Sequence, residues 1–322
     1  MIKLMYIASC MDVFAIVLGL ILLIKGGDWL LDAAVGLSLR LNIPKIVIGM
    51  TVVSFATSAP ELIVSINAAT EGYADLALGN VLGSNIANLA LVLGVVVLIS
   101  PIDVTPTFYK VDAPMMLLAS LLFYVFSLTG NTLDPLEGGF LFVLLIVFLI
   151  YLLFFQKKAV IEEDQIPDQV VSSPLQILMY LWIGGFCLWL GSEVLIKGAI
   201  GLATIMGISE RVISISIVSI GTSIPELSAS LIAIINKEKA ISLGNLIGSN
   251  IFNILAVMGI TAMITPIQIQ DLKLLEIDFI WMVLISILVF VLVFIPSKMR
   301  LGRWEGAILL SLYSLFLYQL LA

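Results

Sequence analysis

SFATSAPELIVS at residues 54–65 returns as SIGTSIPELSAS at residues 219–230, and LGNVLGSNIAN at residues 78–88 returns as LGNLIGSNIFN at residues 243–253. The segment from Gly26 to Pro101 aligns without a gap onto Gly191 to Pro266 at a constant offset of 165, with 29 identities in 76 positions. The matches concentrate on polar residues within apolar stretches, and such residues are costly to keep in lipid unless they have a role. The duplication predicts a binding site between two related halves, at membrane depth.

The composition places the chain in a bilayer. Hydrophobic residues make up 61% of the 322 residues and charged residues only 11%, with a mean hydropathy of +1.20. A soluble domain contains roughly half apolar and a quarter charged residues. We therefore predict an all-α membrane protein with about ten transmembrane helices, because about ten segments reach the roughly 20 residues that a membrane-spanning helix needs. The predicted segments are 11–40, 44–70, 74–100, 112–128, 136–156, 174–203, 209–235, 240–266, 274–296 and 304–321.

Several alternative classes are disfavoured. The segments are too long for barrel strands and do not alternate in polarity. The first segment continues past Asp28 and Trp29 without a small-residue cleavage site, so we interpret it as a helix and not as a signal peptide. Cys10 and Cys187 occupy non-equivalent positions, which disfavours a disulfide or a metal site. Histidine is absent, which removes the usual imidazole ligand and the usual proton shuttle near neutral pH.

Basic residues predict the orientation. With the N-terminus outside, ten basic residues fall on the inner side and three on the outer side, a bias that follows the positive-inside rule. The inner set is Arg40, Lys45, Lys110, Lys157, Lys158, Lys237, Lys239, Lys298, Arg300 and Arg303, and the outer set is Lys3, Arg211 and Lys273. We therefore expect a multi-pass protein of the cell (plasma or inner) membrane with both termini outside.

The predicted organisation is a first five-helix repeat over 1–156, an acidic cytoplasmic linker over 157–173 and a second five-helix repeat over 174–322. The linker acids show no ligand spacing, which favours a solvated hinge over a regulatory cation site. Because each repeat has an odd number of helices, the second enters the membrane from the opposite side. Two inverted five-helix repeats are the architecture of secondary transporters, with the substrate site near the midplane.

Ser54, Thr57, Ser58, Glu61 and Ser65 share one helical face, because they are separated by three or four residues. Proline cannot donate a backbone hydrogen bond and disfavours helical geometry in the residue before it. We therefore expect the helix to be interrupted near Thr57 to Pro60, with Ser58 or Ala59 capping the restart. Backbone carbonyls freed in lipid need partners, and a cation is one. The second copy predicts the same construction.

The second motif forms the opposite wall. Asn80, Ser84 and Asn88 recur every four residues, as do Asn245, Ser249 and Asn253, so each set forms a polar stripe on its helix. The glycine pairs Gly79/Gly83 and Gly244/Gly248 allow helix backbones to approach closely. Together with Glu61 and Glu226, the stripes supply only oxygen ligands, which suit Ca²⁺, Na⁺ or Mg²⁺ better than zinc or copper. Flexible cages with ligands at about 2.3–2.6 Å favour Ca²⁺ over Mg²⁺.

Some polar residues have structural interpretations. A lone buried glutamate can be a protonated structural residue, but two at matched positions within matched stripes favour a site. Asn85 and Asn250 lie off the stripe and are interpreted as packing residues or as residues that support the ligands. Asp28 with Asp32, and Glu193 with Lys197, lie toward helix ends, where charges are ordinary.

The motifs GTSxPE and GNxxGSN resemble the alpha-repeats of the cation/calcium exchanger superfamily, and the resemblance is closest to its prokaryotic sodium/calcium exchangers. It covers both halves and all ten predicted helices. It implies cation coordination by Glu61, Glu226, Thr57, Thr222, Ser58, Ser223, Ser84, Ser249, Asn88 and Asn253, together with the carbonyls of Ser54 and Ser219. The first copy departs from the motif at Ala56. Asn253 is an amide where several members carry aspartate, so the site has two carboxylates, which balance one Ca²⁺ or two Na⁺.

The resulting hypothesis is a secondary antiporter that exchanges Ca²⁺ for Na⁺ by alternating access, with Glu61 and Glu226 at a midplane cation site. We expect no enzymatic activity, no cofactor and no nucleic-acid partner, and a protein that functions as a monomer in the lipid bilayer. A proton-coupled cation exchanger is the alternative within the same class, and H⁺ or K⁺ are the alternative coupling ions. A passive cation channel and an intramembrane enzyme with paired carboxylates are the alternatives from other classes.

Overall fold

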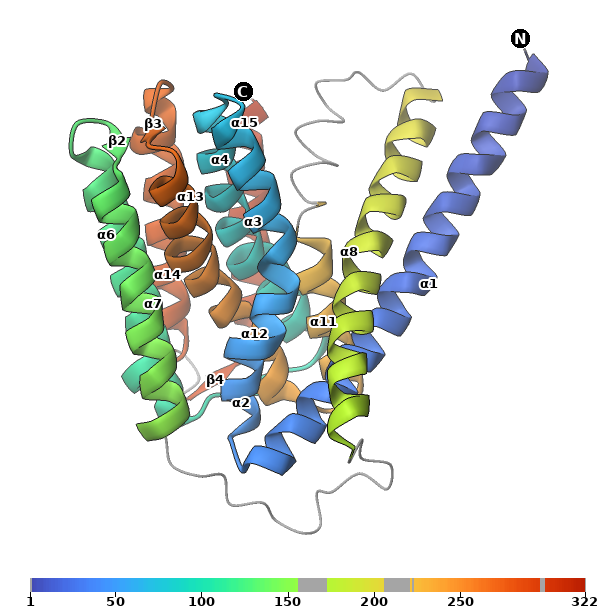
Figure 1. Cartoon of the computed structure of the whole chain (residues 1–322). Coiled ribbons are helices and arrows are strands. Elements are labelled where there is room, and N and C mark those ends of the chain that lie inside the picture. Colours follow the sequence, from blue (N-terminus) through green and yellow to red (C-terminus); the bar gives the residue numbers. More distant parts are fainter. Residues whose placement is uncertain (1, 156–172, 206–220, 222, 296–298, 322) are drawn as a thin grey trace.

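The computed structural model describes residues 2–155, 173–205, 221, 223–295 and 299–321, and these residues form an almost entirely helical body (Figure 1). The first repeat contains five segments: α1 (Ile2–Leu41); α2 (Lys45–Ile48), η1 (Gly49–Val53) and α3 (Ser54–Thr70); α4 (Ala74–Ile86), η2 (Ala87–Val92) and α5 (Leu93–Ile99); η3 (Phe108–Asp112) and α6 (Ala113–Leu128); and α7 (Pro135–Phe155). The second contains α8 (Pro174–Ile205); α11 (Ile224–Ile235); α12 (Lys239–Phe252), η6 (Asn253–Met258) and α13 (Gly259–Ile264); η7 (Leu274–Asp278) and α14 (Phe279–Leu292); and α15 (Arg303–Leu321).

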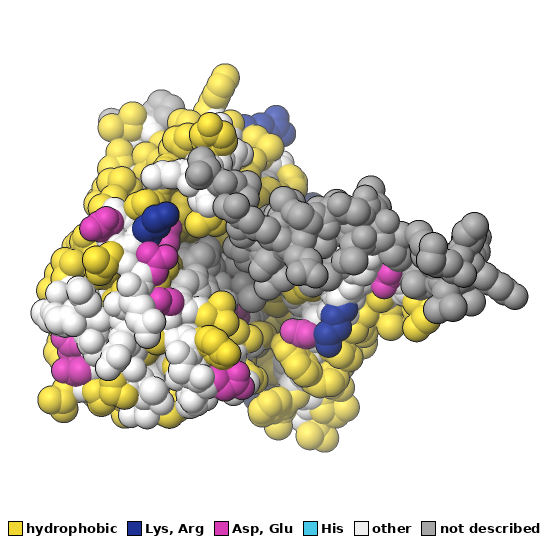
Figure 2. All heavy atoms as spheres, turned by 90° about the horizontal axis from the view of Figure 1, so that it is seen from above, with side chains coloured by type: hydrophobic (Ala, Val, Ile, Leu, Met, Phe, Trp, Pro, Cys, Tyr) yellow, Lys and Arg dark blue, Asp and Glu magenta, His cyan; other side chains and the backbone are white. Residues whose placement is uncertain are grey.

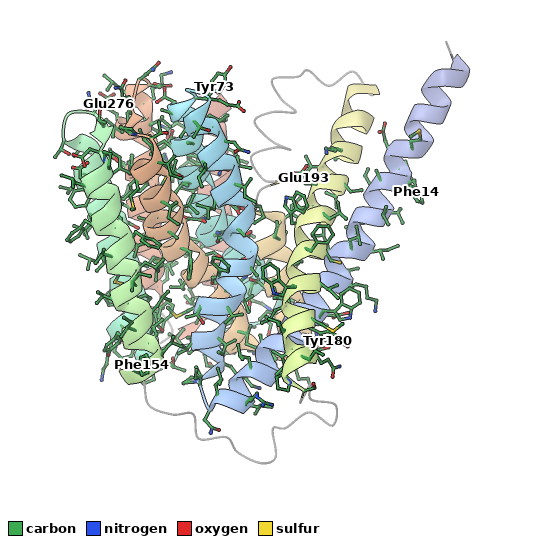
Figure 3. All side chains as sticks on the ribbon, in the orientation of Figure 1. Phe14, Tyr73, Phe154, Tyr180, Glu193 and Glu276 are labelled. Atoms are coloured by element: carbon green, nitrogen blue, oxygen red, sulfur yellow. The ribbon has the colours of Figure 1, made fainter. Side chains whose placement is uncertain are left out.

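The membrane prediction is confirmed. Eight helical segments in the described residues are long and apolar enough to cross a bilayer. The segment predicted over 209–235 is described mainly as α11, which has 12 residues, and α15 has 19 residues. Large apolar side chains face outward, as Phe14 on α1 and Phe154 on α7 do with exposed fractions of 67% and 77% (Figure 3). Such a surface suits lipid and not water.

Two short antiparallel sheets display the inverted repeat. β1 (Ile102–Asp103) pairs with β4 (Arg300–Leu301), and β2 (Thr132–Leu133) pairs with β3 (Ile267–Gln268). β1 and β3 both follow the third segment of their repeats, and β2 and β4 both precede the fifth. Each sheet therefore joins one repeat to the other, and the two sheets exchange roles when the repeats are exchanged. β4 lies at the lower end of the molecule, whereas β2 and β3 lie at the upper end (Figure 1).

The fifth helix of each repeat packs on the third segment of the other repeat. A Cβ atom on Gly306 of α15 would lie 2.7 Å from the carbonyl oxygen of Gly94 on α5. A Cβ atom on Gly138 of α7 would lie 2.7 Å from the carbonyl oxygen of Gly259 on α13. Glycine allows these helix backbones to touch. The two repeats are thus interlocked and do not form two separate lobes.

α1 and α8 pack along each other, side by side at the edge of the body (Figure 1). A Cβ atom on Gly26 would lie 2.9 Å from the carbonyl oxygen of Gly184, and one on Gly19 would lie 2.8 Å from that of Gly191. The contacts recur every seven residues on both helices in opposite directions, as expected for an antiparallel pair with a glycine seam. Gly26 and Gly184 therefore lie directly against each other, backbone to backbone.

The predicted interruption at Thr57 to Pro60 is wrong for the first repeat. α3 runs from Ser54 to Thr70 with Pro60 inside it. The proline leaves the carbonyl of residue 56 without its helical donor, and membrane helices tolerate this because neighbouring groups and small local adjustments of the helix satisfy the freed carbonyl. In the second repeat the prediction fits the described residues, because α11 begins at Ile224 with Ser223 as its N-terminal cap and Pro225 in its first turn.

The predicted glycine contacts are asymmetric between the repeats. A Cβ atom on Gly244 would collide with the carbonyl oxygen of Ile46, and one on Gly248 would lie 2.6 Å from the Cα atom of Met50. α12 therefore lies directly against α2 and η1. Gly79 is equivalent to Gly244, yet its nearest neighbour would be a Leu274 methyl group at 3.9 Å. The close-approach prediction is confirmed for the second repeat and wrong for Gly79.

Candidate cation site

The two glutamates of the repeated motif lie in the interior. Glu61 on α3 and Glu226 on α11 are both fully buried, and they lie close enough for their charges to interact. Neither carboxylate oxygen of Glu61 is hydrogen-bonded to another side chain in the described part of the chain. Burying an ionised carboxylate without a partner is strongly unfavourable, so such a group needs a compensating charge. The paired glutamates are therefore the candidate position for a compensating cation.

Hydroxyl groups surround Glu226. Ser58 Oγ donates to Glu226 Oε1 at 3.4 Å, and the Thr57 and Ser249 side chains lie near the same carboxylate. Thr57 Oγ1 and Ser249 Oγ are 3.2 Å apart. Because Thr57 and Ser58 belong to the first repeat and Glu226 to the second, the candidate site lies across the boundary between the repeats.

The start of α3 is tied to α12. Ser54 Oγ donates to the carbonyl oxygens of Gly49 at 2.8 Å and of Asn245 at 2.9 Å. The Ser54 carbonyl oxygen, predicted as a ligand, accepts a hydrogen bond from Thr57 Oγ1 at 3.3 Å. Thr57 Oγ1 also donates to Asn245 Oδ1 at 3.2 Å. Main-chain and side-chain oxygens of both repeats therefore converge beside the carboxylates.

The asparagines of the two stripes fall into two groups: Asn80 and Asn245 brace the motifs by hydrogen bonds, and Asn88 and Asn253 are buried candidate ligands. Asn80 Nδ2 donates to Ser65 Oγ and Asn245 Nδ2 donates to Ser230 Oγ, both at 3.1 Å, so equivalent bonds brace the two motifs within each repeat. Asn88 lies in η2 and Asn253 begins η6, and both are fully buried. Neither amide atom of Asn88 has a hydrogen-bond partner among the described residues. π-Helical turns inside α-helices are frequently located at functional sites, so η2 and η6 mark Asn88 and Asn253 as candidate ligands.

The described residues form no metal site with three or more charged or imidazole ligands. In the described part of the chain, no three His, Cys, Asp or Glu side chains converge on one point. A cation between Glu61 and Glu226 would rely on two carboxylates completed by neutral oxygens of hydroxyl, amide and carbonyl groups. That donor set suits Na⁺ and Ca²⁺.

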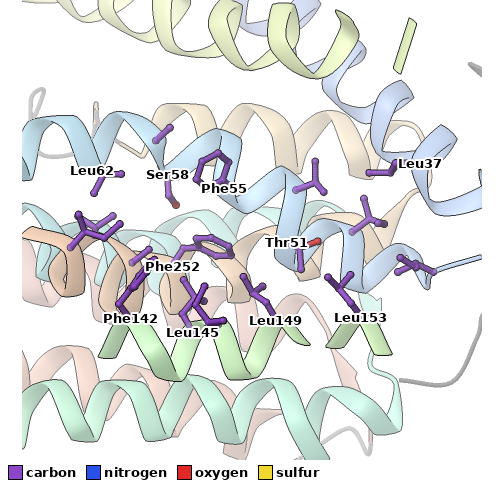
Figure 4. A pocket seen from close by; sticks show the side chains of 18 of the residues that line it. Leu37, Thr51, Phe55, Ser58, Leu62, Phe142, Leu145, Leu149, Leu153 and Phe252 are labelled. Atoms are coloured by element: carbon purple, nitrogen blue, oxygen red, sulfur yellow. The ribbon is translucent and has the colours of Figure 1, made fainter. Parts of the chain in front are cut away.

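A groove of about 630 Å³ lies beside the site, between α3, α7 and η6 (Figure 4). Its walls are almost wholly apolar, formed by residues such as Phe55, Phe142 and Phe252. Thr51 and Ser58 are the polar side chains in its lining. Because Ser58 also contacts Glu226, the groove adjoins the carboxylates through this one residue, and its apolar lining is unsuited to ions.

Comparison with known proteins decides the family. The family model for the sodium/calcium exchanger protein matches residues 11–154 and 177–322, which together make up most of the chain. The chain belongs to the sodium/calcium exchanger family. The sodium/calcium exchanger MaX1 of Methanosarcina acetivorans is 31% identical over 344 residues, covering 94% of this chain and 96% of the relative. CaxA of Alkalimonas amylolytica is 36% identical over 310 residues, covering 95% of this chain and 97% of the relative.

The fold matches a solved member of the same family. A structure of the sodium-calcium exchanger NCX_Mj, soaked with zero Na⁺ and Ca²⁺, superposes with a TM-score of 0.82 at 28% identity, covering 97% of this chain and 99% of that one. The exchanger described here is therefore a multi-pass membrane protein from a family of transporters, built from two inverted repeats.

Most of the predicted ligands of this exchanger are buried in one region. The ten that the structure describes are each at most 3% exposed: Ser54, Thr57, Ser58, Glu61, Ser84, Asn88, Ser223, Glu226, Ser249 and Asn253. Ser219 and Thr222 lie outside the described residues. Asn245 and Asn85 are not among the predicted ligands. In the structure, however, Asn245 contacts Thr57, and Asn85 contacts Asn253. The four-residue stripe had already indicated Asn245, whereas the role of Asn85 depends on how the helices cross.

Proposed function

We propose that this exchanger moves Ca²⁺ against Na⁺ by alternating access, with Glu61 and Glu226 binding the transported ions at the membrane midplane. The observation that carries the proposal is the pair of fully buried, symmetry-matched carboxylates, one of which has no side-chain hydrogen bond in the described residues. The remaining predicted ligands complete the oxygen cage. The family membership and the exchanger MaX1 support the choice of Na⁺ and Ca²⁺ as the ions.

The charge of the site explains obligatory exchange. Two ionised carboxylates cost several kcal/mol each when they are occluded in a low-dielectric interior without a counter-ion. One Ca²⁺ or two Na⁺ cancel both charges, so the loaded protein passes through the closed state and the empty protein does not. No separate structural element is required to keep the empty protein from switching sides.

The two five-helix repeats, 1–156 and 174–322, are the units of the proposed cycle, joined by the linker 157–173. The α1–α8 pair is the element that moves, because its backbones meet along a glycine seam and it packs at the edge of the body (Figure 1). Because the two helices pack on each other, they can shift as one unit relative to the interlocked core, and this shift would open the site to one side of the membrane or to the other. Alternating access then exposes the cations first to one side and then to the other.

The proposed orientation has both termini outside. The upper end, which carries both termini, bears the exposed Glu276 and, seen from above, further acidic side chains (Figures 2 and 3). Glu71 follows α3 at this same end, two residues before Tyr73 (Figure 3). The lower end, where α1 ends and where Lys45 pairs with Glu238, bears the exposed Arg40 and Lys237. The basic residues at the lower end are the part of this distribution that follows the positive-inside rule, and the cell (plasma or inner) membrane is the proposed location.

The orientation predicts a labelling pattern in a background with Cys10 and Cys187 replaced by serine. Glu71→Cys is expected to react in intact cells with a membrane-impermeant maleimide. Asp103→Cys, exposed at the opposite end, is expected to react only after the membrane is permeabilised. The reverse pattern would contradict the proposed orientation.

The transport assay tests the function directly. Purified protein in liposomes loaded with Na⁺ is expected to take up Ca²⁺ when Na⁺ is diluted outside, and to take up none when both sides hold equal Na⁺. Uptake driven by a pH gradient in the absence of Na⁺ would instead favour a proton-coupled exchanger. Ca²⁺ flux without any counter-ion gradient would indicate a channel and would contradict the proposal.

A further inference from the structure

We propose that Asn85 is a positioning residue that orients the amide of Asn253, so that the carbonyl oxygen of Asn253 and not its NH₂ group faces the cation. The inference rests on the proposed function, because it assumes that Asn253 belongs to the cation site. It adds a residue of α4 to the machinery and gives it a chemical task.

The contact is direct. Asn253 Nδ2 donates a hydrogen bond to Asn85 Oδ1 at 3.1 Å, which joins the second repeat to the first. Both side chains are fully buried. Asn253 Oδ1 has no hydrogen-bond partner among the described residues. The bond occupies the donor end of the amide and leaves its acceptor end for a cation.

Asn85 is itself held in one orientation. Its Nδ2 donates to the main-chain carbonyl oxygen of Asn250 at 3.4 Å and lies 3.7 Å from the sulfur of Met282. With the NH₂ group turned toward these acceptors, the opposite edge of the amide presents Oδ1 to Asn253. The Asn250 carbonyl on α12 therefore fixes the amide of Asn85 on α4, and Asn85 in turn fixes the amide of Asn253 at the start of η6.

An amide ligand needs this support, whereas a carboxylate does not. The side-chain amide of asparagine has one end that accepts and one end that donates, and the two have nearly the same shape. If the NH₂ end faced the site, its positive hydrogens would repel a cation and remove one ligand oxygen. A carboxylate has two equivalent oxygens, so turning it over changes nothing. Groups that orient metal ligands typically contribute about 10- to 100-fold to metal affinity.

The equivalent residues of the other half make no such contact. Asn250, equivalent to Asn85, donates Nδ2 to the carbonyl oxygen of Leu246 within its own helix at 2.7 Å. Asn88, equivalent to Asn253, has no hydrogen-bond partner in the described residues. The Asn85–Asn253 bond is therefore a specific contact and not an automatic result of the repeat.

The test is a double-mutant cycle on purified full-length protein, with Ca²⁺ binding measured by calorimetric titration. Asn85→Leu removes the acceptor at similar volume, and Asn253→Asp removes the need for orientation. We expect Asn85→Leu to weaken Ca²⁺ binding by about 10- to 100-fold when residue 253 is asparagine. In the Asn253→Asp background we expect the same substitution to weaken binding by less than about 3-fold, because a carboxylate presents an oxygen in either orientation. If Asn85→Leu does not fold, Asn85→Ser serves in both backgrounds, since its short hydroxyl does not reach Asn253.

Equal losses in the two backgrounds would mean that Asn85 only fills space, and would overturn the inference. Unchanged Ca²⁺ affinity in Asn85→Leu alone would overturn it as well. Glu61→Gln is titrated alongside as a separate control. If this variant retains Ca²⁺ binding, the proposed function itself is contradicted. If it loses Ca²⁺ binding while Asn85→Leu weakens binding equally in the Asn253 and Asn253→Asp backgrounds, only the positioning role is contradicted.

Discussion

Glu61→Gln is expected to abolish Na⁺-driven Ca²⁺ uptake into proteoliposomes. Glutamine keeps the shape of the fully buried side chain but removes one of the two charges that balance a divalent ion in the proposed site. Removing one partner of a buried charge pair typically costs about 3–5 kcal/mol. At about 1.4 kcal/mol per factor of ten, this weakens Ca²⁺ binding by roughly 100- to 4,000-fold. Uptake should therefore fall to the level of protein-free liposomes.

Glu276→Gln is the matched control for this experiment. It removes one negative charge from an exposed position at the upper end of the molecule (Figure 3) and should leave uptake unchanged. Glu226→Gln should repeat the loss, because Glu226 is the equivalent residue of the other repeat. Uptake by Glu61→Gln at the wild-type rate would defeat the assignment of the cation site.

Gly244→Ala is expected to destabilise the protein and to impair transport. The added methyl group would collide with the carbonyl oxygen of Ile46 and lie 3.1 Å from the Met50 amide nitrogen, and backbone atoms cannot rotate away as a side chain can. Overpacking of this kind typically costs about 1–3 kcal/mol. Because the same contact holds α12 against η1, the hydroxyl and amide oxygens beside Glu226 should also be displaced.

Gly79→Ala is the control that the duplication itself provides. Gly79 is the equivalent residue, but its nearest neighbour would be 3.9 Å away, and alanine favours a helix over glycine by about 1 kcal/mol. Thermal unfolding in detergent should therefore show a lower midpoint for Gly244→Ala and an unchanged or higher midpoint for Gly79→Ala. Equal effects of the two substitutions would contradict the asymmetric packing.

Much of the architecture could be predicted because its signals are local. Apolar segments of spanning length predicted the helices, and the gap-free repeat together with an odd helix count predicted the inversion that the two small sheets display. The burial of Glu61 and Glu226 followed from polar residues placed at helical spacing inside apolar segments. These features depend on periodicity and polarity, which a single sequence contains.

The remaining features depend on how the helices cross. The rule that proline breaks helices failed at Pro60, because a membrane helix can continue through a proline where its neighbours satisfy the freed carbonyl. Gly79 and Gly244 have the same local motif but different neighbours, so no local pattern distinguishes them. The bond from Asn253 to Asn85 joins residues 168 positions apart, and only the assembled helices bring them together.

The interlocked fifth helices have a consequence for biogenesis. When the ribosome has released the first repeat into the membrane, Gly94 on α5 still lacks its partner, because α15 has not yet been synthesised. Gly138 on α7 likewise waits for Gly259 on α13. The first repeat therefore exposes these glycine backbones to lipid until the second repeat is inserted. The final packing of the helices follows insertion of both repeats.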